Sequence, residues 1–451
     1  MKTLNYFLYL LIILQVSCKN FLDEKPDASL KEANSLEDLD ALLNNTKIMN
    51  YYSMGLGEAS ADNYYLDKSS WEAFDQHERQ LYTWGGEIFY QFYLNPWLDY
   101  YKSIYYSNHV LAKLDKIASE KKIKGRAMEL RGRALFFRAF GHYKLLSLFS
   151  NAYDKDASKT DLGIPLRLND DFNIPSERGT VEACYQQILQ DLHEAESLLP
   201  LKSDNMHLPS RISAYVLLSW IYQARAEFDQ SILYAQKALE IDSKLKDYKE
   251  YSQEARYPFF GFDDEIVYIV AGGGIYNMLG KSYCKIDTLL YSSYDIHDLR
   301  KKLFFERNKD GSYNFKGSYV GSRGLFMGLT VADAYLNLSE GLIRLNKTEE
   351  GLRFLEIFQR HRYDETYSPP LASMSQESAL KLVLDERRKE FIMRDSRWGD
   401  IKRLNKIDDG VIIPVRKLGD SEFLLKRNDN RYALPLPAEI IELTGMPQNP
   451  R

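Results

Sequence analysis

Three acidic side chains lie close together in one short stretch, the kind of spacing that a pair of catalytic carboxylates would need. Asp385, Glu386 and Glu390 occur in the segment LDERRKEF, where they alternate with basic residues. Asp385 with Lys389, and Glu390 with Arg394, are spaced four residues apart with the acid first, the order that favours ion pairs along a helix. We therefore predict ion pairs on a helix surface and no catalytic set.

The seven histidines and three cysteines form none of the common patterns of a metal site. There is no HExxH motif, no CxxC motif and no EF-hand loop. Irregular loops rich in Asp and carbonyl groups can supply oxygen ligands to a structural calcium ion, and that alternative stays open. We predict no cofactor and no catalytic metal. We expect Cys184 to be a buried thiol and Cys284 to be a free thiol in a loop, and neither to be a nucleophile.

Aromatic residues are better suited to bind a ligand. They make up 13% of the chain, which contains 33 Tyr. Flat rings can cover the C–H faces of sugars or peptide side chains, while nearby polar groups fix the orientation. Two blocks, residues 60–86 and 272–319, supply our candidate ligand-binding residues: Asp62, Asn63, Tyr64, Tyr65, Trp71, Trp84, Tyr276, Tyr283, Tyr291 and Tyr294. The alternative is that these rings only pack the loops onto the rest of the protein.

The segment Arg211–Ser243 has the pattern of two short antiparallel helices joined by a tight turn around 226–229. The first has an apolar stripe that contains one small residue, and the second has a seam of small residues, Ser231, Ala235 and Ala238. This order resembles one tetratricopeptide (TPR) repeat, which buries its apolar face only when it stacks on neighbouring repeats. We therefore expect other helical pairs.

Helical spacing recurs through most of the chain and is absent from three regions. It predicts helices over 29–45, 97–117, 127–148, 180–199, 330–345, 349–362 and 376–394. The irregular regions are 51–86, 248–328 and the tail from Gly410. We predict an all-α fold of about four TPR-like repeats. Its scaffold comprises about 97–150, 180–243 and 328–362, the loops 50–90 and 250–325 form the ligand face, and 376–451 forms a C-terminal segment.

The N-terminus has the features of an export signal. An early Lys2 precedes an apolar run from Tyr6 to Leu14, and a small residue, Ser17, lies just before Cys18. Nine apolar residues are too few to cross a bilayer core, which needs about 20, so we predict a cleaved signal peptide over 1–17. A cysteine at this place is typical of a bacterial lipoprotein, and we predict Cys18 as the lipid anchor. The alternative is an ordinary signal peptide in which Cys18 is incidental.

The charge balance excludes a nucleic-acid footprint. The net charge is −5 and the sequence pI is about 5.9, and no basic cluster stands out.

Segments in a fixed order resemble the SusD/RagB family of outer-membrane lipoproteins. Cys18 followed by NFLDEKP is similar to the family's mature start, and Asn108 lies in a helix similar to its first repeat helix. The other matching segments are RGRALFFRAFGHYKLLSLFSNAY, LGIPLRLND with VEACYQQILQDLHEAESLLP, AYLNLSEGLIRLNKTEEGLRFLEIFQRHR, LVLDERRKEFIMRDSRWGDIKRLNK, and LPLPAEI with PQNP. The chain departs from the family at Lys316-Gly317-Ser318-Tyr319, where a Lys-Tyr pair is usual, and no ligand site can be transferred residue by residue.

The resemblance implies one domain over 18–451, anchored by lipid in the outer membrane and exposed at the cell surface. It implies a partner, a SusC-like TonB-dependent β-barrel transporter, and an oligosaccharide as the usual cargo. In the RagB branch the cargo is an oligopeptide, which is the first alternative. The resemblance implies no enzymatic activity.

Two other functions remain as rivals. An all-α glycan-degrading enzyme would share the aromatic residues and helical hairpins, and its carboxylates would come from the only local acidic cluster, Asp62, Asp67, Glu72 and Asp75. A periplasmic TPR scaffold for protein partners would share the repeats, but it does not account for the lipoprotein signal and the two aromatic blocks.

Overall fold

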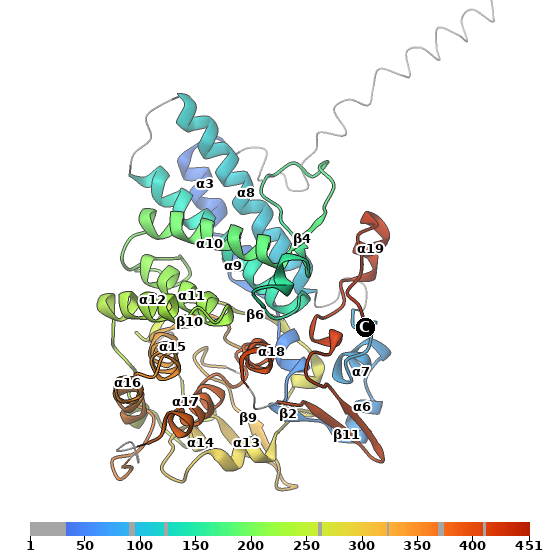
Figure 1. The fold of residues 1–451 in the computed structure, drawn as a ribbon, viewed down its shortest axis with the longest axis vertical. Coiled ribbons are helices and arrows are strands. Elements are labelled where there is room, and N and C mark those ends of the chain that lie inside the picture. Colours follow the sequence, from blue (N-terminus) through green and yellow to red (C-terminus); the bar gives the residue numbers. More distant parts are fainter. Residues whose placement is uncertain are drawn as a thin grey trace, which may run out of the picture.

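A computed structural model describes residues 33–89, 95–120, 125–259, 264–322, 324–368, 374–408 and 412–451. Cys18 and the predicted signal peptide lie outside these residues. Within them the protein consists mainly of helices, with short two-stranded ladders between (Figure 1). This confirms the predicted all-α class.

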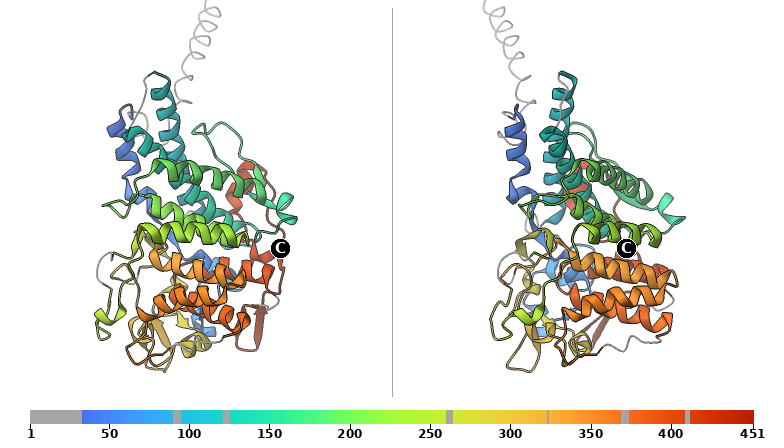
Figure 2. Two further views of the ribbon diagram at one scale, coloured as in Figure 1. Left: turned by 60° about the vertical axis from the view of Figure 1, so that its left-hand side comes forward. Right: turned by 90° about the vertical axis from the view of Figure 1, so that its left-hand side faces the viewer.

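Long helices pack in chain order and form the scaffold. In the side views the green and orange helices α11 to α17 stack as layers below the long helices α8 and α9 (Figure 2). The scaffold helices are α8 (Pro96–Glu120), α9 (Arg126–Phe149), α10 (Val181–Leu198), α11 (Arg211–Ala224), α12 (Phe228–Ile241), α15 (Val331–Arg344), α16 (Thr348–Arg360), α17 (Gln376–Glu390) and α18 (Arg397–Ile407).

Small residues let these helices approach one another closely. The seam of Ser231, Ala235 and Ala238 predicted on α12 is fully buried. At Gly351 of α16, an added Cβ would lie 2.8 Å from the carbonyl oxygen of Ser339 on α15. Any larger side chain there would force α15 and α16 apart. The TPR-like hairpins therefore depend on small side chains at the positions where helices cross.

Two of the hairpin turns have the same backbone geometry. Ala226 follows α11 with φ 58°, and Asn346 follows α15 with φ 62°. In the first turn the N–H of Glu227 donates to the carbonyl of Tyr222 at 2.9 Å, six residues closing one ring, which is the Schellman motif. Asn tolerates the left-handed conformation, whereas Ala is strained there.

We expect Ala226→Gly to stabilise the protein. Glycine removes a strain of about 1–2 kcal/mol from the left-handed conformation of the folded protein. It also raises the conformational entropy of the unfolded chain, which offsets part of this gain, so the net stabilisation should be about 0.5–1 kcal/mol. Urea denaturation followed by circular dichroism would measure it. Asn346→Gly is the matched control and should gain less. A lower midpoint for Ala226→Gly would contradict the strain.

The regions between the scaffold helices hold more regular structure than the sequence predicted. Both aromatic blocks contain short helices and strands, and the tail forms a β-hairpin and a helix. The short helices are α3 (Leu36–Leu43), α4 (Thr46–Met49), α5 (Leu56–Ser60), α6 (Lys68–Glu72), α7 (Gln76–Tyr82), α13 (Thr288–Ser293), α14 (Arg300–Leu303) and α19 (Ala438–Thr444).

The strands pair two by two. β1 (Tyr51–Met54) pairs in parallel with β6 (Ala271–Ile275). The antiparallel pairs are β2 (Tyr64–Tyr65) with β7 (Lys285–Ile286), β3 (Leu162–Pro165) with β4 (Arg178–Thr180), β5 (Ile266–Tyr268) with β10 (Leu329–Thr330), β8 (Phe305–Arg307) with β9 (Tyr313–Phe315), and β11 (Val415–Leu418) with β12 (Ser421–Leu424). One buried apolar cluster extends from Ala33 to Met446 and includes residues of every region.

One predicted helix needs correction here. The helix predicted over 376–394 ends at Glu390, because Met393 and Asp395 both adopt φ 57° and break it before α18 begins.

Cys184 and Cys284 are both free thiols, as predicted. Cys184 is buried, and Cys284 lies in a loop. Cys284 is only 3% exposed as well, and burial raises the pKa of its thiol well above the usual range.

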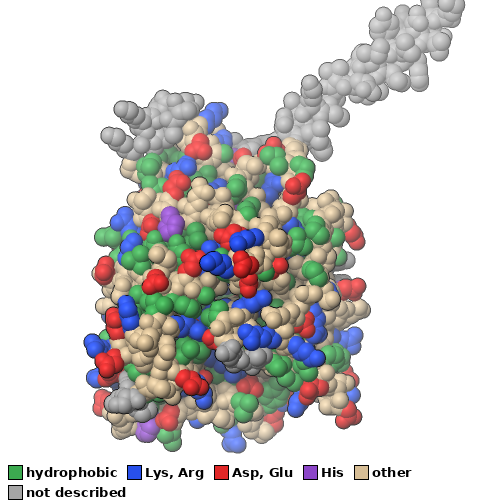
Figure 3. Space-filling view, in the orientation of Figure 1, with side chains coloured by type: hydrophobic (Ala, Val, Ile, Leu, Met, Phe, Trp, Pro, Cys, Tyr) green, Lys and Arg blue, Asp and Glu red, His purple; other side chains and the backbone are tan. Residues whose placement is uncertain are grey.

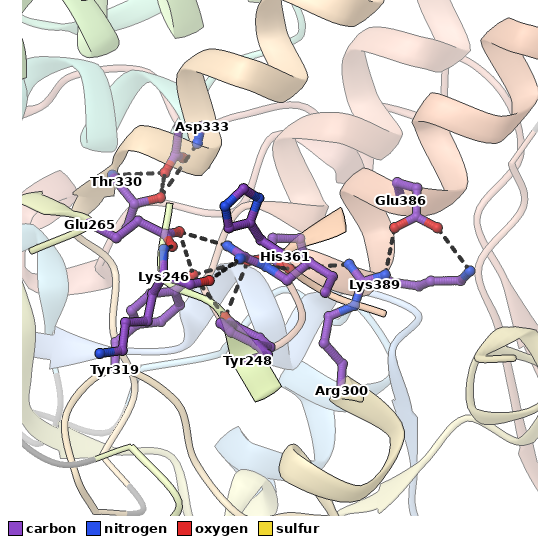
Figure 4. Close-up of polar contacts among 12 residues, drawn as sticks. Lys246, Tyr248, Glu265, Arg300, Tyr319, Thr330, Asp333, His361, Glu386 and Lys389 are labelled. Carbon is purple, nitrogen blue, oxygen red and sulfur yellow. Dashed lines mark hydrogen bonds and ion pairs between the residues drawn. The ribbon is translucent and has the colours of Figure 1, made fainter. Parts of the chain in front are cut away.

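Two of the three predicted carboxylates of α17, Glu386 and Glu390, are buried, which corrects the prediction of ion pairs on a helix surface; Asp385 is exposed. Arg300 and Arg362 are fully enclosed, and each donates to a carboxylate of this helix. Figure 4 shows the contact between Arg300 and Glu386. Glu390 accepts from Arg300 at 3.1 Å and from Arg362 at 2.9 Å, and Glu386 accepts from Arg300 at 2.5 Å. The helix does form ion pairs, but the two predicted pairings are wrong. Lys389 pairs with Glu386 at 3.2 Å and Arg394 with Asp333 at 2.9 Å, and the pairs of Glu386 and Glu390 lie inside the protein.

The same network extends beyond α17. Arg362 also binds Glu265 at 2.7 Å, and its guanidinium lies 4.0 Å from the ring centre of Tyr248. The Tyr319 hydroxyl donates to Glu390 at 2.9 Å. We call Glu265, Arg300, Arg362, Glu386 and Glu390 the buried ionic network. It joins the second aromatic block to the scaffold, because Arg300 belongs to α14 and Glu390 to α17.

Candidate functional site

The two aromatic blocks lie side by side although 200 residues of sequence separate them. Tyr64 pairs with Ile286 and Tyr65 with Lys285 in the β2–β7 ladder. The side chain of Glu78 accepts from the backbone N–H of Asn277 at 3.0 Å. Figure 1 places α6, α7 and β2 together at the lower right, with α13 close by at the bottom. A ligand could therefore touch both blocks at once.

Five of the ten predicted ligand-binding residues are core residues. Asn63, Tyr64, Trp84, Tyr276 and Tyr294 are each at most 5% exposed. Their polar atoms have internal partners: Trp84 Nε1 donates to the carbonyl of Ser60 at 2.9 Å, and the Tyr294 hydroxyl donates to the carbonyl of Lys389 at 2.8 Å. No ligand can reach these side chains in this structure, and we remove them from the candidate face.

Asp62 is half-buried, and two arginines of the protein bind its carboxylate. Arg397 grips its carboxylate with two hydrogen bonds of 2.7 and 2.8 Å, and Arg388 lies 3.4 Å away. Burial alone would raise the pKa of Asp62, but these two guanidiniums outweigh it and hold the pKa well below its usual range. The carboxylate ties α18 to the first aromatic block and is not free to bind a ligand.

Four predicted residues remain half-exposed: Tyr65, Trp71, Tyr283 and Tyr291. Tyr313 of β9, in the same block, is half-exposed as well and stacks on Tyr291 with ring centres 3.5 Å apart. We call Tyr65, Trp71, Tyr283, Tyr291 and Tyr313 the aromatic face. The sequence predicted four of these rings and missed Tyr313, although it lies in the second aromatic block. It could not separate the four from the buried rings, because loop sequence shows no period.

Neighbouring contacts hold these rings in place. Trp71 Nε1 donates to the carbonyl of Arg79 at 3.1 Å, and the Tyr283 ring lies 4.8 Å from that of Phe74. Beside Tyr65, the Lys285 ammonium bridges Asp67 at 2.5 Å and Asp310 at 2.6 Å, which raises its pKa. The site thus combines flat apolar rings with charged groups.

The acidic cluster of the enzyme alternative is engaged in structure. Asp67 pairs with Lys285, Asp75 caps α7 by accepting the N–H of Glu78 at 2.9 Å, and Glu72 lies 3.7 Å from Lys68.

Within the described ranges no group of three or more His, Cys, Asp or Glu side chains could hold a metal ion. No helix in the described part of the chain is long and apolar enough to cross a membrane.

Besides the aromatic face, the scaffold carries a pocket at residues for which the sequence predicted only a packed helix. It has a volume of about 220 Å³ and lies between α8, the segment 165–176 and α19. Trp97, Tyr101 and Tyr105 line it from α8, together with Asn169 and other residues. Their spacing of four residues places the three rings on one side of the helix. That spacing could have identified the pocket, but it resembles an ordinary core stripe.

Glu58 is a buried acid close to Asn63 and Asp395. It accepts from the side chain of Asn63 at 2.8 Å and is fully enclosed in α5. Burial raises the pKa of Glu58 to about 7, with Asp395 and Asp62 adding repulsion and the Asn63 hydrogen bond opposing the rise. The folded protein therefore keeps this proton to a higher pH than the unfolded chain, and ionising Glu58 costs stability as the pH rises from about 4.5 to about 7.

We expect Glu58→Gln to stabilise the protein at pH 8 and to change little at pH 4.5. Gln keeps the acceptor for Asn63 and removes the charge, so the gain at pH 8 should approach 3 kcal/mol, from ~1.4 kcal/mol per pKa unit. Thermal unfolding across this pH range would measure it. Glu349→Gln, on an exposed helical site, is the control. An equal effect of Glu58→Gln at both pH values would show that Glu58 is not protonated in the folded protein.

Two family models match the chain. One, described as "Starch-binding associating with outer membrane", matches residues 20–223, and one described as "SusD family" matches residues 324–450. Together they span well over half of the sequence. They leave out all of the second aromatic block.

Known proteins match over most of the chain. SusD-like protein P2 of Formosa agariphila is 23% identical in an alignment 382 residues long. The alignment covers 70% of this chain and 73% of that protein. A SusD superfamily protein from Bacteroides thetaiotaomicron has a TM-score of 0.72 at 19% identity, over 92% of this chain and 100% of that one. A SusD-like carbohydrate binding protein from Bacteroides vulgatus has a TM-score of 0.66 at 18% identity, over 91% and 96% of the two chains. These likenesses show a shared fold.

Proposed function

The chain belongs to the SusD family, and from that membership we propose that it captures an oligosaccharide at the cell surface. It would pass this cargo to a SusC-like TonB-dependent transporter in the outer membrane. SusD-like proteins are binding proteins, and we propose capture without hydrolysis. The first matching model carries starch binding and outer-membrane association in its description, which supports this reading.

The observation that carries the proposal is the aromatic face. Two blocks distant in sequence join at β2–β7 and leave five rings half-exposed beside Lys285, Asp67 and Asp310. About 100 Å² of apolar surface per ring, at roughly 25 cal/mol/Å², gives ~2.5 kcal/mol before ordering costs. Several such contacts are needed for useful affinity, and each alone is weak. Reversible binding of that kind suits transfer to a transporter.

We expect Trp71→Ala to weaken oligosaccharide binding at least tenfold, about 1.4 kcal/mol, because the ring supplies one full stacking contact. Isothermal titration with starch-type and other oligosaccharides, and with oligopeptides as the competing class, would measure it. The melting temperature should fall by only a few degrees, since Trp71 is only partly buried.

Trp84→Ala is the matched control, because Trp84 is a buried tryptophan of the same block. It should lower the free energy of unfolding by about 3–5 kcal/mol through the cavity it leaves. If Trp71→Ala destabilises the protein as much as Trp84→Ala and leaves the affinity of the folded fraction unchanged, Trp71 is a core residue and the aromatic face is not the site.

We also propose that Cys18 carries the lipid that holds the protein at the outer membrane. The support comes from the sequence, in which a short apolar segment ends at Ser17-Cys18, and from the description of the first family model. Labelled palmitate should enter the wild-type protein and should not enter Cys18→Ser in the producing bacterium. Equal labelling of the two proteins would overturn this anchor.

A further inference from the structure

A cavity of about 90 Å³ lies inside the scaffold, and none of the five residues of the aromatic face lines it. It is bounded by the C-terminal half of α9, by α11 and by the first turns of α18, three helices that meet at the centre of Figure 1. Half-buried residues such as Ala152 and Gly399 line it too, so it has a mouth to solvent. At about 10–15 Å³ per water position, it has room for about six to nine waters, the bulk of a ring-sized molecule. We call it the interhelical cavity.

The walls of the interhelical cavity carry hydrogen-bond donors that have no protein partner. The Lys144 ammonium forms no hydrogen bond or ion pair with any described residue, and the same holds for the Tyr143 hydroxyl. Arg394 is 4% exposed, and its Nη1 is also without an acceptor among the described residues. Ser396 is the residue just before α18, and its side chain does not cap the helix. The Ser396 Oγ has no hydrogen-bond partner among the described residues. Lys144 and Tyr143 are half-buried residues, whereas Arg394 Nη1 and Ser396 Oγ are themselves buried atoms. Buried donors without a partner are costly and rare in folded proteins.

The carboxylates near these donors are already engaged. Asp333 accepts from Arg394 at 2.9 Å and from Trp220 at 2.8 Å. Asp400 accepts from Arg403 at 2.7 Å, and Asp395 from the N–H of Glu58 at 2.8 Å. Each anion of the wall therefore has a partner, while one ammonium does not. The unbalanced side of this cavity is cationic, which favours an anionic ligand.

The remaining wall is aromatic. Tyr143, Tyr153, Tyr185 and Trp220 line the cavity together with aliphatic side chains of α9 and α11. Figure 3 shows basic and acidic side chains side by side on this face, between the positions that Figure 1 labels α10 and α18. Flat rings beside unpartnered donors are the usual lining of a small-molecule site.

We propose that the interhelical cavity binds a small organic acid, one carboxylate on a ring-sized body. The carboxylate would accept from Lys144 and from the spare donors of Arg394, Tyr143 or Ser396. The ring would lie against the aromatic wall. A sugar acid and an aromatic acid share this chemistry. The site is separate from the proposed oligosaccharide face, and neither depends on the other.

The test uses the mature chain with D-glucuronate and benzoate as probes, and D-glucose and benzamide as their uncharged counterparts. Isothermal titration and thermal shift should show binding of at least one acid, at least tenfold tighter than its counterpart. Lys144→Met should weaken that binding at least tenfold, whereas Lys155→Met, which removes an exposed lysine, should not change it. Binding of glucuronate alone would assign a sugar acid, and binding of benzoate alone an aromatic acid.

Three results would overturn the proposal. Neither acid binds better than its counterpart; Lys144→Met binds as tightly as the wild type; or acetate and sulfate bind as well as the two acids, which would show an adventitious ion only. If Lys144→Met fails to fold, Tyr143→Phe replaces it, because it removes only a hydroxyl and should still weaken binding. Oligosaccharide titration of the same variants should be unchanged, so a failure here is distinct from a failure of the aromatic face.

Discussion

The pairing of Arg300 and Arg362 with Glu390 is the constraint that the rest of the architecture must satisfy. Two guanidiniums and several carboxylates lie here with no exposed surface. Burying such charges costs several kcal/mol per ion, and the cost is recovered only when the geometry and the additional hydrogen bonds are nearly complete. The partners come from four parts of the chain: the residue before β5, α14, the segment just after α16, and α17. The network can therefore form only when all these parts are in place.

That requirement explains how irregular sequence acquires a fixed shape. Residues 248–328 have no long helix to pack, yet Arg300 and Tyr319 anchor this region to α17, and Glu265 anchors it to Arg362 after α16. The first aromatic block is held by the same means. Arg397 and Arg388 bind Asp62, and the buried Arg416 donates to the carbonyls of Tyr64 and Ala61. Arginine suits this work because its planar fork satisfies several acceptors at once. Polar anchors here replace the apolar stripe that a helix would use.

The sequence predicted the scaffold well and the site only in part, for one physical reason. Helical spacing of apolar residues identified α9, α10, α11 and α12 to within a few residues, since burial and period coincide there. A prediction from helical spacing assigns charged residues to the solvent-facing side of a helix, so Glu386 and Glu390 were expected on the surface. It also gives no information in loops, where Trp71 and Trp84 looked alike although one is half-exposed and the other is 1% exposed. The pairing of β2 with β7 joins distant parts of the chain, so the local sequence does not indicate it, apart from the two tyrosines of β2.

The fixed position of the aromatic face bears on how the proposed capture could be both effective and reversible. Ordering a mobile side chain on binding costs about 0.5–1.5 kcal/mol, which would consume much of a single stacking contact. Tyr291 is already stacked on Tyr313, and Trp71 is already bound to the carbonyl of Arg79. These rings lose little freedom when a ligand arrives, so modest contacts can add up. Each contact is still weak, and a ligand that leaves one ring after another meets no single large barrier. The buried ionic network would therefore contribute to the proposed binding indirectly, because it keeps the block that carries Tyr291 and Tyr313 in one position.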